Sequence, residues 1–112
     1  PFDCDWVIAK DVLEHVPNIR QFVNDELIIY AKVGLFVVVP LSLVDGQPYV
    51  VQSYERDITH LHRFTLATWV DMFLKPGWSV TASYRFPGVK DNYWKPKWES
   101  GNGFLTVKRI QP

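Results

Sequence analysis

The run Leu35–Val39, which Pro40 ends, constrains the fold more than any other part of this 112-residue chain. It is continuous, apolar and rich in β-branched residues, a pattern typical of a strand in a parallel sheet with both faces covered. Proline has no backbone N–H for the ladder of a sheet, so the strand should end there. Trp6–Ala9 is a second apolar run without alternation, and it predicts another strand buried on both faces.

A helix is predicted between these two strands. Asn18 can serve as its N-cap, and Gln21 follows three positions later, as in a capping box. The apolar side chains recur at helical spacing, at Ile19, Phe22, Val23, Leu27 and Tyr30. This helix should span residues 18–31, and Gly34 lies beyond its end. Strand, helix and strand within about 35 residues predict a right-handed βαβ unit.

The second half of the chain predicts a helix and two strands after a loop. Residues 41–63 show no firm period, and we interpret them as a long loop with some local order. Thr65 can cap a helix that Pro76-Gly77 ends. Its apolar positions are Leu66, Trp69, Val70, Phe73 and Leu74. Residues 78–85 alternate as a strand, and 104–110 should pair antiparallel with them. The order β-α-β-loop-α-β-β places residues 1–112, as a single domain, in the α/β class.

Composition excludes several classes of protein. A content of 47% hydrophobic and 15% aromatic residues favours a packed core over disorder. Twelve basic and twelve acidic residues balance, so no global attraction to nucleic acid or to an anionic membrane is expected. The longest near-continuous apolar stretch, 33–44, is too short to span a bilayer. A lone cysteine, Cys4, has no activating neighbour in the sequence and fits a reducing compartment, so we expect a cytoplasmic protein.

Three ordered segments resemble one enzyme family. Phe2–Val16, which contains a Leu-Glu-His-Val segment, resembles the fourth strand and following loop of class I S-adenosylmethionine-dependent methyltransferases. Gly34–Pro40 is similar to the glycine turn, strand and proline of that family, and Asp57–Thr65 to the stretch before its last core helix. The match covers nearly the whole chain in the right order. It implies a partial Rossmann-like sheet, the C-terminal half of the full fold, with its last two strands antiparallel.

The sequence departs from the family at the front of the cofactor site. The glycine-rich loop after the family's first strand is absent, and so is the acidic residue that binds the ribose hydroxyls. The glycines here are isolated in turns or, at Gly101 and Gly103, precede a strand. The resemblance therefore implies a fragment of a larger enzyme that transfers a methyl group from S-adenosylmethionine to a small-molecule or glycan-like acceptor. The sequence leaves open whether the fragment alone is active.

Candidate site residues follow the first predicted strand. Ala9, Lys10 and Asp11 stand at its carboxyl end, where open α/β sheets bind their ligands. By resemblance their backbone would pass near the methionine end of the cofactor; the alternative is an ordinary exit from a strand. Glu14 and His15 often face the active site in the family, and a histidine there can take a proton from the acceptor. Their alternative is a purely structural role.

His60 is the third candidate catalytic residue. His60 and His62 alternate around Leu61, so on an extended segment both side chains would point the same way, into a substrate pocket or as loop anchors. Some relatives bind a divalent metal with residues corresponding to Asp11, Glu14, His15 and a later histidine. Because the Leu-Glu-His-Val segment is also common in metal-free relatives, no metal is assigned from the sequence.

The expected partners are a small-molecule acceptor, with neither nucleic acid nor membrane, and a second copy bound through an exposed sheet edge. One alternative is a non-catalytic truncated module that self-associates or binds another subunit. Another is a different Rossmann-like enzyme, such as a dehydrogenase. An aromatic and basic cluster can stack on a flat substrate or pack a loop onto the body. It comprises Tyr93, Trp94 and Trp98 among Lys90, Lys95 and Lys97.

Overall fold

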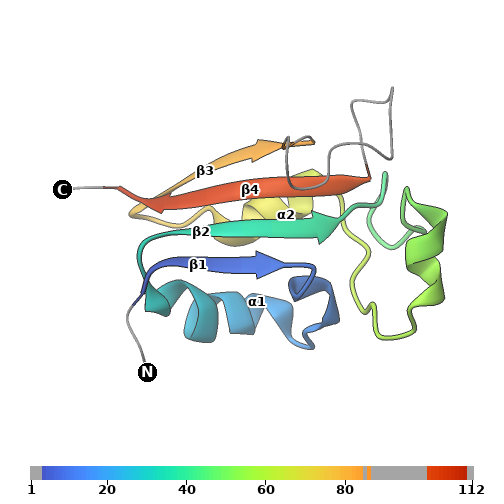
Figure 1. The fold of residues 1–112 in the computed structure, drawn as a ribbon, viewed down its shortest axis with the longest axis horizontal. Helices are drawn as coiled ribbons and strands as arrows, with labels where there is room; N and C mark the ends of the chain where they lie inside the picture. Colours follow the sequence, from blue (N-terminus) through green and yellow to red (C-terminus); the bar gives the residue numbers. More distant parts are fainter. Residues whose placement is uncertain (1–3, 85, 87–100, 111–112) are drawn as a thin grey trace.

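The computed structural model describes residues 4–84, 86 and 101–110, which contain one four-stranded sheet (Figure 1). The strands are β1 (Cys4–Lys10), β2 (Ala31–Pro40), β3 (Trp78–Ser83) and β4 (Asn102–Arg109), in the order β1-β2-β4-β3. β1 and β2 are parallel, whereas β4 runs antiparallel to both β2 and β3. Because helices separate β1 from β2 and β2 from β3, the expected α/β class is confirmed.

The first helical segment is irregular. It consists of α1 (Ile19–Phe22), a π-helical turn η2 (Val23–Leu27) and a 3-10 turn η3 (Ile28–Tyr30). The predicted capping box is wrong, because Asn18 has a left-handed backbone (φ 52°, ψ 49°) and its side chain caps nothing. An N-cap side chain bonds the first turn from an extended backbone, which this residue does not have.

The second strand begins earlier than the sequence predicted. β2 starts at Ala31, so Gly34 lies inside the strand and not in a turn before it. A Cβ on Gly34 would lie 2.5 Å from the carbonyl oxygen of Val107 and 2.7 Å from Cζ3 of Trp6. The glycine is required here by the close approach of β4 and of an indole ring.

β1 is an edge strand of the described sheet, and the predicted burial on both of its faces is wrong. Ala9 is only 5% exposed, because it faces the helices. Ile8 is 70% exposed and Trp6 is 44% exposed, since they point to the other face. An apolar run cannot reveal how many of its faces a neighbour covers. β2, in contrast, has a partner on each side, as expected for an interior strand.

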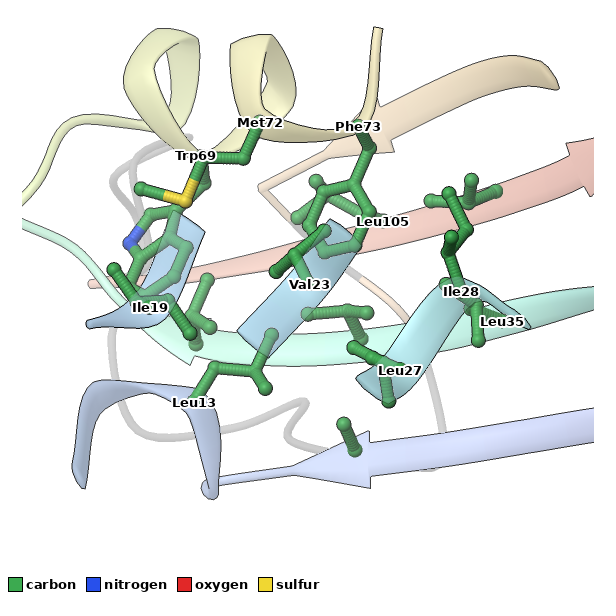
Figure 2. Packing of buried hydrophobic residues seen from close by; sticks show 14 of the residues in the cluster. Leu13, Ile19, Val23, Leu27, Ile28, Leu35, Trp69, Met72, Phe73 and Leu105 are labelled. Carbon is green, nitrogen blue, oxygen red and sulfur yellow. The ribbon is translucent and has the colours of Figure 1, made fainter. Parts of the chain in front are cut away.

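The core fills the space between one face of the sheet and the helices (Figure 2). Leu13, Val23, Trp69, Phe73 and Leu105 are all fully buried there. Full burial of one such side chain contributes about 1.5–3 kcal/mol. The first helical segment and α2 (Leu66–Phe73) therefore cover the same face of the sheet.

Helix α2 confirms its predicted start. The hydroxyl oxygen of Thr65 accepts a hydrogen bond from the N–H of Thr68 at 3.2 Å, as an N-cap does. The helix ends before Gly77, whose φ of 87° suits glycine.

None of the helices within residues 4–84, 86 and 101–110 is long and apolar enough to cross a membrane. The predicted aromatic and basic cluster at 90–98 lies outside the described residues.

The segment predicted as a long loop has local order. It contains a 3-10 turn, η4 (Gln52–Arg56), and an isolated bridge between Ser42 and Tyr49. The N–H of Leu61 donates to the carbonyl oxygen of Glu14 at 2.8 Å. This bond brings the end of the segment beside the turn that follows β1.

Candidate functional site

A polar pocket lies at the carboxyl ends of the parallel strands β1 and β2. It has a volume of about 220 Å³ and is lined by Asp11, Glu14, His15, Pro40, Tyr54, Asp57 and His60. Open α/β sheets bind ligands at this edge. The structure thus brings together four residues that the sequence analysis singled out, Asp11, Glu14, His15 and His60.

Glu14 is the buried acid of the pocket. It lies in the 3-10 turn η1 (Leu13–His15), and only 2% of its side chain is exposed. Among the described residues, its Oε1 has no hydrogen-bond partner. Burial raises the pKa of this carboxyl group above its ordinary value, although a backbone hydrogen bond and the nearby histidines lower it. A buried carboxylate oxygen without a partner is costly unless a cation or a donor binds it.

The two histidines of the pocket are oriented by backbone carbonyl groups. Nδ1 of His60 lies 2.8 Å from the carbonyl oxygen of Tyr54, and Nδ1 of His15 lies 3.1 Å from that of Thr59. A carbonyl oxygen only accepts, so in each neutral ring Nδ1 carries the proton. The lone pair is then on Nε2, and the two Nε2 atoms lie 3.6 Å and 3.8 Å from Oε2 of Glu14.

Glu14, His15 and His60 form a group that can hold a metal ion. One ligand atom from each of Glu14, His15 and His60 can be chosen so that all three lie within 4.8 Å of one another. Histidine and carboxylate ligands suit divalent transition metals such as manganese, iron and zinc. Metal-binding histidines usually donate their other ring N–H to a carbonyl or a carboxylate, as both do here. The residues therefore fit a divalent ion, although none was assigned from the sequence.

Several contacts fix His60 in place. Its ring centroid lies 4.5 Å from that of His15 and 5.3 Å from that of Tyr49. Asp57 accepts from the N–H of Thr59 at 2.9 Å, and its Oδ2 lies 3.5 Å from Nε2 of His60. Because 46% of the Asp57 side chain is exposed, this carboxylate faces both solvent and the cluster.

A second group of contacts holds the chain segments on either side of His60 in place. The guanidinium of Arg63 donates to Glu55 at 2.8 Å and lies 5.3 Å from the centre of the Tyr49 ring. Glu55 also accepts from the N–H of Tyr49 at 2.8 Å. The hydroxyl of Tyr49 donates to the carbonyl oxygen of His62 at 2.6 Å, and burial raises the pKa of Tyr49 to about 12. No sequence pattern indicated the roles of these residues, because the roles depend on tertiary contacts.

His62 does not share the direction of His60, so the prediction that both point the same way is wrong. Nε2 of His62 donates to the carbonyl oxygen of Val16 at 2.6 Å, and its ring stacks on Phe64. The segment between 60 and 65 is not a strand, so strict alternation does not apply to it. His62 anchors the loop, which was the alternative for this residue.

The three residues that we expected near the cofactor lie where the chain leaves β1. Ala9 is buried, Lys10 is exposed, and Asp11 lines the pocket with a left-handed backbone (φ 57°). The N–H of Asp11 donates to the carbonyl oxygen of Val38 at 3.0 Å, which fixes the chain where it leaves the sheet. An aspartate tolerates this conformation better than most residues. A role in binding cofactor stays a prediction.

Comparison with known proteins points to one fold. No family model matches the sequence, and no curated protein matches it. The chain is similar to a solved structure, that of the small RNA methyltransferase HEN1, with a TM-score of 0.60 and 20% sequence identity. The similarity covers 98% of this chain but only 14% of the length of that one. The chain therefore has a methyltransferase-like fold.

The same comparison corrects one expectation. The sequence analysis expected a small-molecule acceptor and no nucleic acid. This is contradicted, because the structural neighbour is an RNA methyltransferase. That expectation rested on the balanced net charge, and charge balance over a whole chain says nothing about a local site.

Proposed function

We propose that this chain forms the acceptor side of a methyltransferase that uses S-adenosylmethionine to methylate a ribose hydroxyl group of RNA. The methyltransferase-like fold supports methyl transfer, and the RNA-methylating neighbour supports a nucleic-acid acceptor. The observation that carries the proposal is the convergence of Glu14, His15 and His60 at the ligand-binding edge of the sheet.

The cluster suits a hydroxyl acceptor. The 2′-hydroxyl group distinguishes RNA from DNA, and a neutral hydroxyl is a weak nucleophile. A divalent ion held by Glu14, His15 and His60 would polarise that hydroxyl group and lower its pKa. The N–H groups of both histidines are already bonded to carbonyl oxygens, so the protein holds the two Nε2 atoms ready before a ligand arrives.

The cofactor would lie beside the end of β1. The carboxylate of Asp11 faces the pocket and can accept hydrogen bonds from the ammonium group of the methionine part. Ala9 and Lys10 would contribute backbone along the same side. In the transfer, the acceptor oxygen forms a bond to the methyl carbon as the bond from sulfur to that carbon breaks, and the hydroxyl proton leaves to water. Alignment of the two reactants is the main contribution of the protein.

Manganese binding to the 112-residue chain is the first test. Electron paramagnetic resonance or calorimetry should detect one Mn²⁺ bound per chain. His60→Gln should abolish this binding because it removes a ligand. His62→Gln is the matched control, since His62 contacts Val16 outside the pocket and the glutamine amide can still donate to that carbonyl oxygen, so binding should stay intact. Absence of binding in the wild-type chain, or equal loss in both variants, would refute the metal site.

Methyl transfer is the second test. The chain is incubated with Mn²⁺, tritium-labelled S-adenosylmethionine and an RNA oligonucleotide, with DNA of the same sequence as the control. Label should appear in RNA and not in DNA, which lacks the 2′-hydroxyl. Calorimetry with S-adenosylhomocysteine measures cofactor binding separately. A chain that binds both Mn²⁺ and S-adenosylhomocysteine but labels no RNA would overturn the proposed transfer to RNA.

A further inference from the structure

A second cavity lies beyond the end of β2. It has a volume of about 120 Å³. Leu41 and Ser42, which directly follow β2, form one wall, and Leu66 at the start of α2 forms another. Tyr84, which follows β3, closes a third side. The N–H of Leu41 donates to the carbonyl oxygen of Gly101 at 2.9 Å, which joins the end of β2 to the residue before β4.

The chemistry of this cavity differs from that of the polar pocket. None of the residues that line it is charged, and its walls are largely apolar. The nearby start of α2 is already occupied by Asp45, which accepts from the N–H of Thr65 at 2.8 Å and from the hydroxyl of Thr68 at 2.6 Å. This carboxylate would repel a phosphate group. The cavity therefore suits an uncharged, flat, largely apolar group with a hydrogen-bonding edge.

Ser42 supplies a hydroxyl group to this cavity. The residue is 4% exposed, and its Oγ has no partner among the described residues. Its backbone N–H, in contrast, donates to the carbonyl oxygen of Phe64 at 2.9 Å. A buried hydroxyl group without a partner destabilises the protein unless a ligand bonds it. A hydroxyl both donates and accepts, so it can pair with either kind of atom on a nucleobase edge.

The two cavities are lined by consecutive residues of the chain. Pro40 lines the polar pocket and Leu41 lines the second cavity, and consecutive Cα atoms are about 3.8 Å apart. In a nucleotide the base is bonded directly to the ribose. We propose that the second cavity binds the base of the RNA nucleotide whose ribose hydroxyl faces Glu14, His15 and His60. This inference rests on the proposed function and adds the site that recognises the acceptor.

Nucleoside titration tests the inference directly. Adenosine, guanosine, cytidine and uridine are added in turn to the isotope-labelled chain, and amide shifts are followed by NMR. At least one nucleoside should shift the amides of Ser42, Leu43 and Ala67, whereas ribose 5-phosphate, which lacks a base, should not. If S-adenosylhomocysteine shifts these amides and the nucleosides do not, the cavity takes the adenine of the cofactor and the inference is overturned. Equal shifts with ribose 5-phosphate would also overturn it.

A blocked cavity gives a second test. Ala67 lies on the exposed side of α2 and lines the cavity, so Ala67→Phe should fill it without disturbing the core. Asp71→Phe is the control, because this exposed residue lies one turn further along the same helix. The Ala67 variant should weaken nucleoside binding and raise the KM for RNA by about tenfold or more, with Mn²⁺ affinity unchanged. Asp71→Phe should alter none of these quantities.

Ser42→Ala refines the assignment. Loss of one hydrogen bond should weaken nucleoside binding by about five- to tenfold.

If the chain binds Mn²⁺ and methylates RNA, but Ala67→Phe and Ser42→Ala leave the KM unchanged, the base site is refuted and the proposed function stands. If the wild-type chain neither binds Mn²⁺ nor methylates RNA, the proposed function fails. The nucleoside titration then decides the base site by itself.

Discussion

Replacement of Glu14 by glutamine should separate the cost of burying this acid from its value as a ligand. The side chain is 2% exposed, and its Oε1 has no partner among the described residues. Burial raises the pKa of Glu14 in the folded chain above the unfolded value. The stabilising contribution of this carboxyl group is therefore complete below its pKa in the unfolded chain. The contribution is lost as the pH rises through its pKa in the folded chain. Without metal, Glu14→Gln should be more stable than wild type at neutral pH and should lack this loss.

In the presence of Mn²⁺, wild type should instead be more stable than Glu14→Gln. At a Mn²⁺ concentration of 100 times its Kd, wild type gains about 2.7 kcal/mol, because the ion binds only the folded chain. For a chain of this size that corresponds to a rise in Tm of roughly 10 °C. If loss of the carboxylate lowers Mn²⁺ affinity about 100-fold, the variant gains roughly 0.4 kcal/mol at the same concentration. Its Tm should then rise by only about 2 °C.

Thermal unfolding followed by circular dichroism, with and without Mn²⁺, measures both effects. Mg²⁺ and a chelator serve as controls for general salt effects. Equal Mn²⁺-induced shifts in wild type and Glu14→Gln would refute the role of Glu14 as a ligand. If Glu14→Gln without metal is less stable than wild type at neutral pH, burial of the Glu14 carboxylate does not lower the stability of the folded chain.

Three further predictions concern the fold. Gly34→Ala should destabilise the chain by about 1–3 kcal/mol in urea unfolding, because its Cβ would lie 2.5 Å from the backbone oxygen of Val107; an unchanged midpoint would contradict this close approach. Phe73→Ala should cost about 3–5 kcal/mol in the same assay, since Phe73 is fully buried, and a cost below 1 kcal/mol would argue against that packing. The guanidinium of Arg63 holds the pKa of Glu55 below its usual value. The pair therefore stabilises the fold above the pKa of Glu55 in the unfolded chain, and this stabilisation is lost as the pH falls through its pKa in the folded chain. Arg63→Met should therefore flatten the acid side of the stability profile, and an identical profile would show that the pair contributes nothing.

The parts of the fold that were predictable are those in which the sequence pattern and the packing agree. The apolar run Leu35–Val39 lies inside β2, and the amphipathic pattern after Thr65 forms α2 with the expected cap. The exposure of Ile8 was not predictable, because an apolar run does not show whether both faces are covered. The start of β2 was also missed, since Ala31 and the residues after it fit the end of a helix equally well. Strand pairing decided between the two, through the register of β2 with β1 and β4.

Four of the residues that line the polar pocket were singled out from the sequence, but their geometry was not predictable. Glu14, His15 and His60 were singled out by resemblance, and the structure brings them together. What the sequence could not show is the orientation of the histidine rings, which depends on carbonyl groups of Tyr54 and Thr59. Every residue carries a carbonyl group, so no residue type signals such a contact.

The order of the loop and the binding of a ligand at the site are therefore linked. The carbonyl groups that orient the two rings belong to residues 54 and 59, within the segment that Glu55, Arg63 and Tyr49 hold in place. If this segment moves, both histidines lose the partner that fixes their tautomer, and Glu14 loses its bond to Leu61. Coupling of this kind is reciprocal, so an ion that binds the two Nε2 atoms must also stabilise the segment behind them. The loop that showed no pattern in the sequence is thus part of the site.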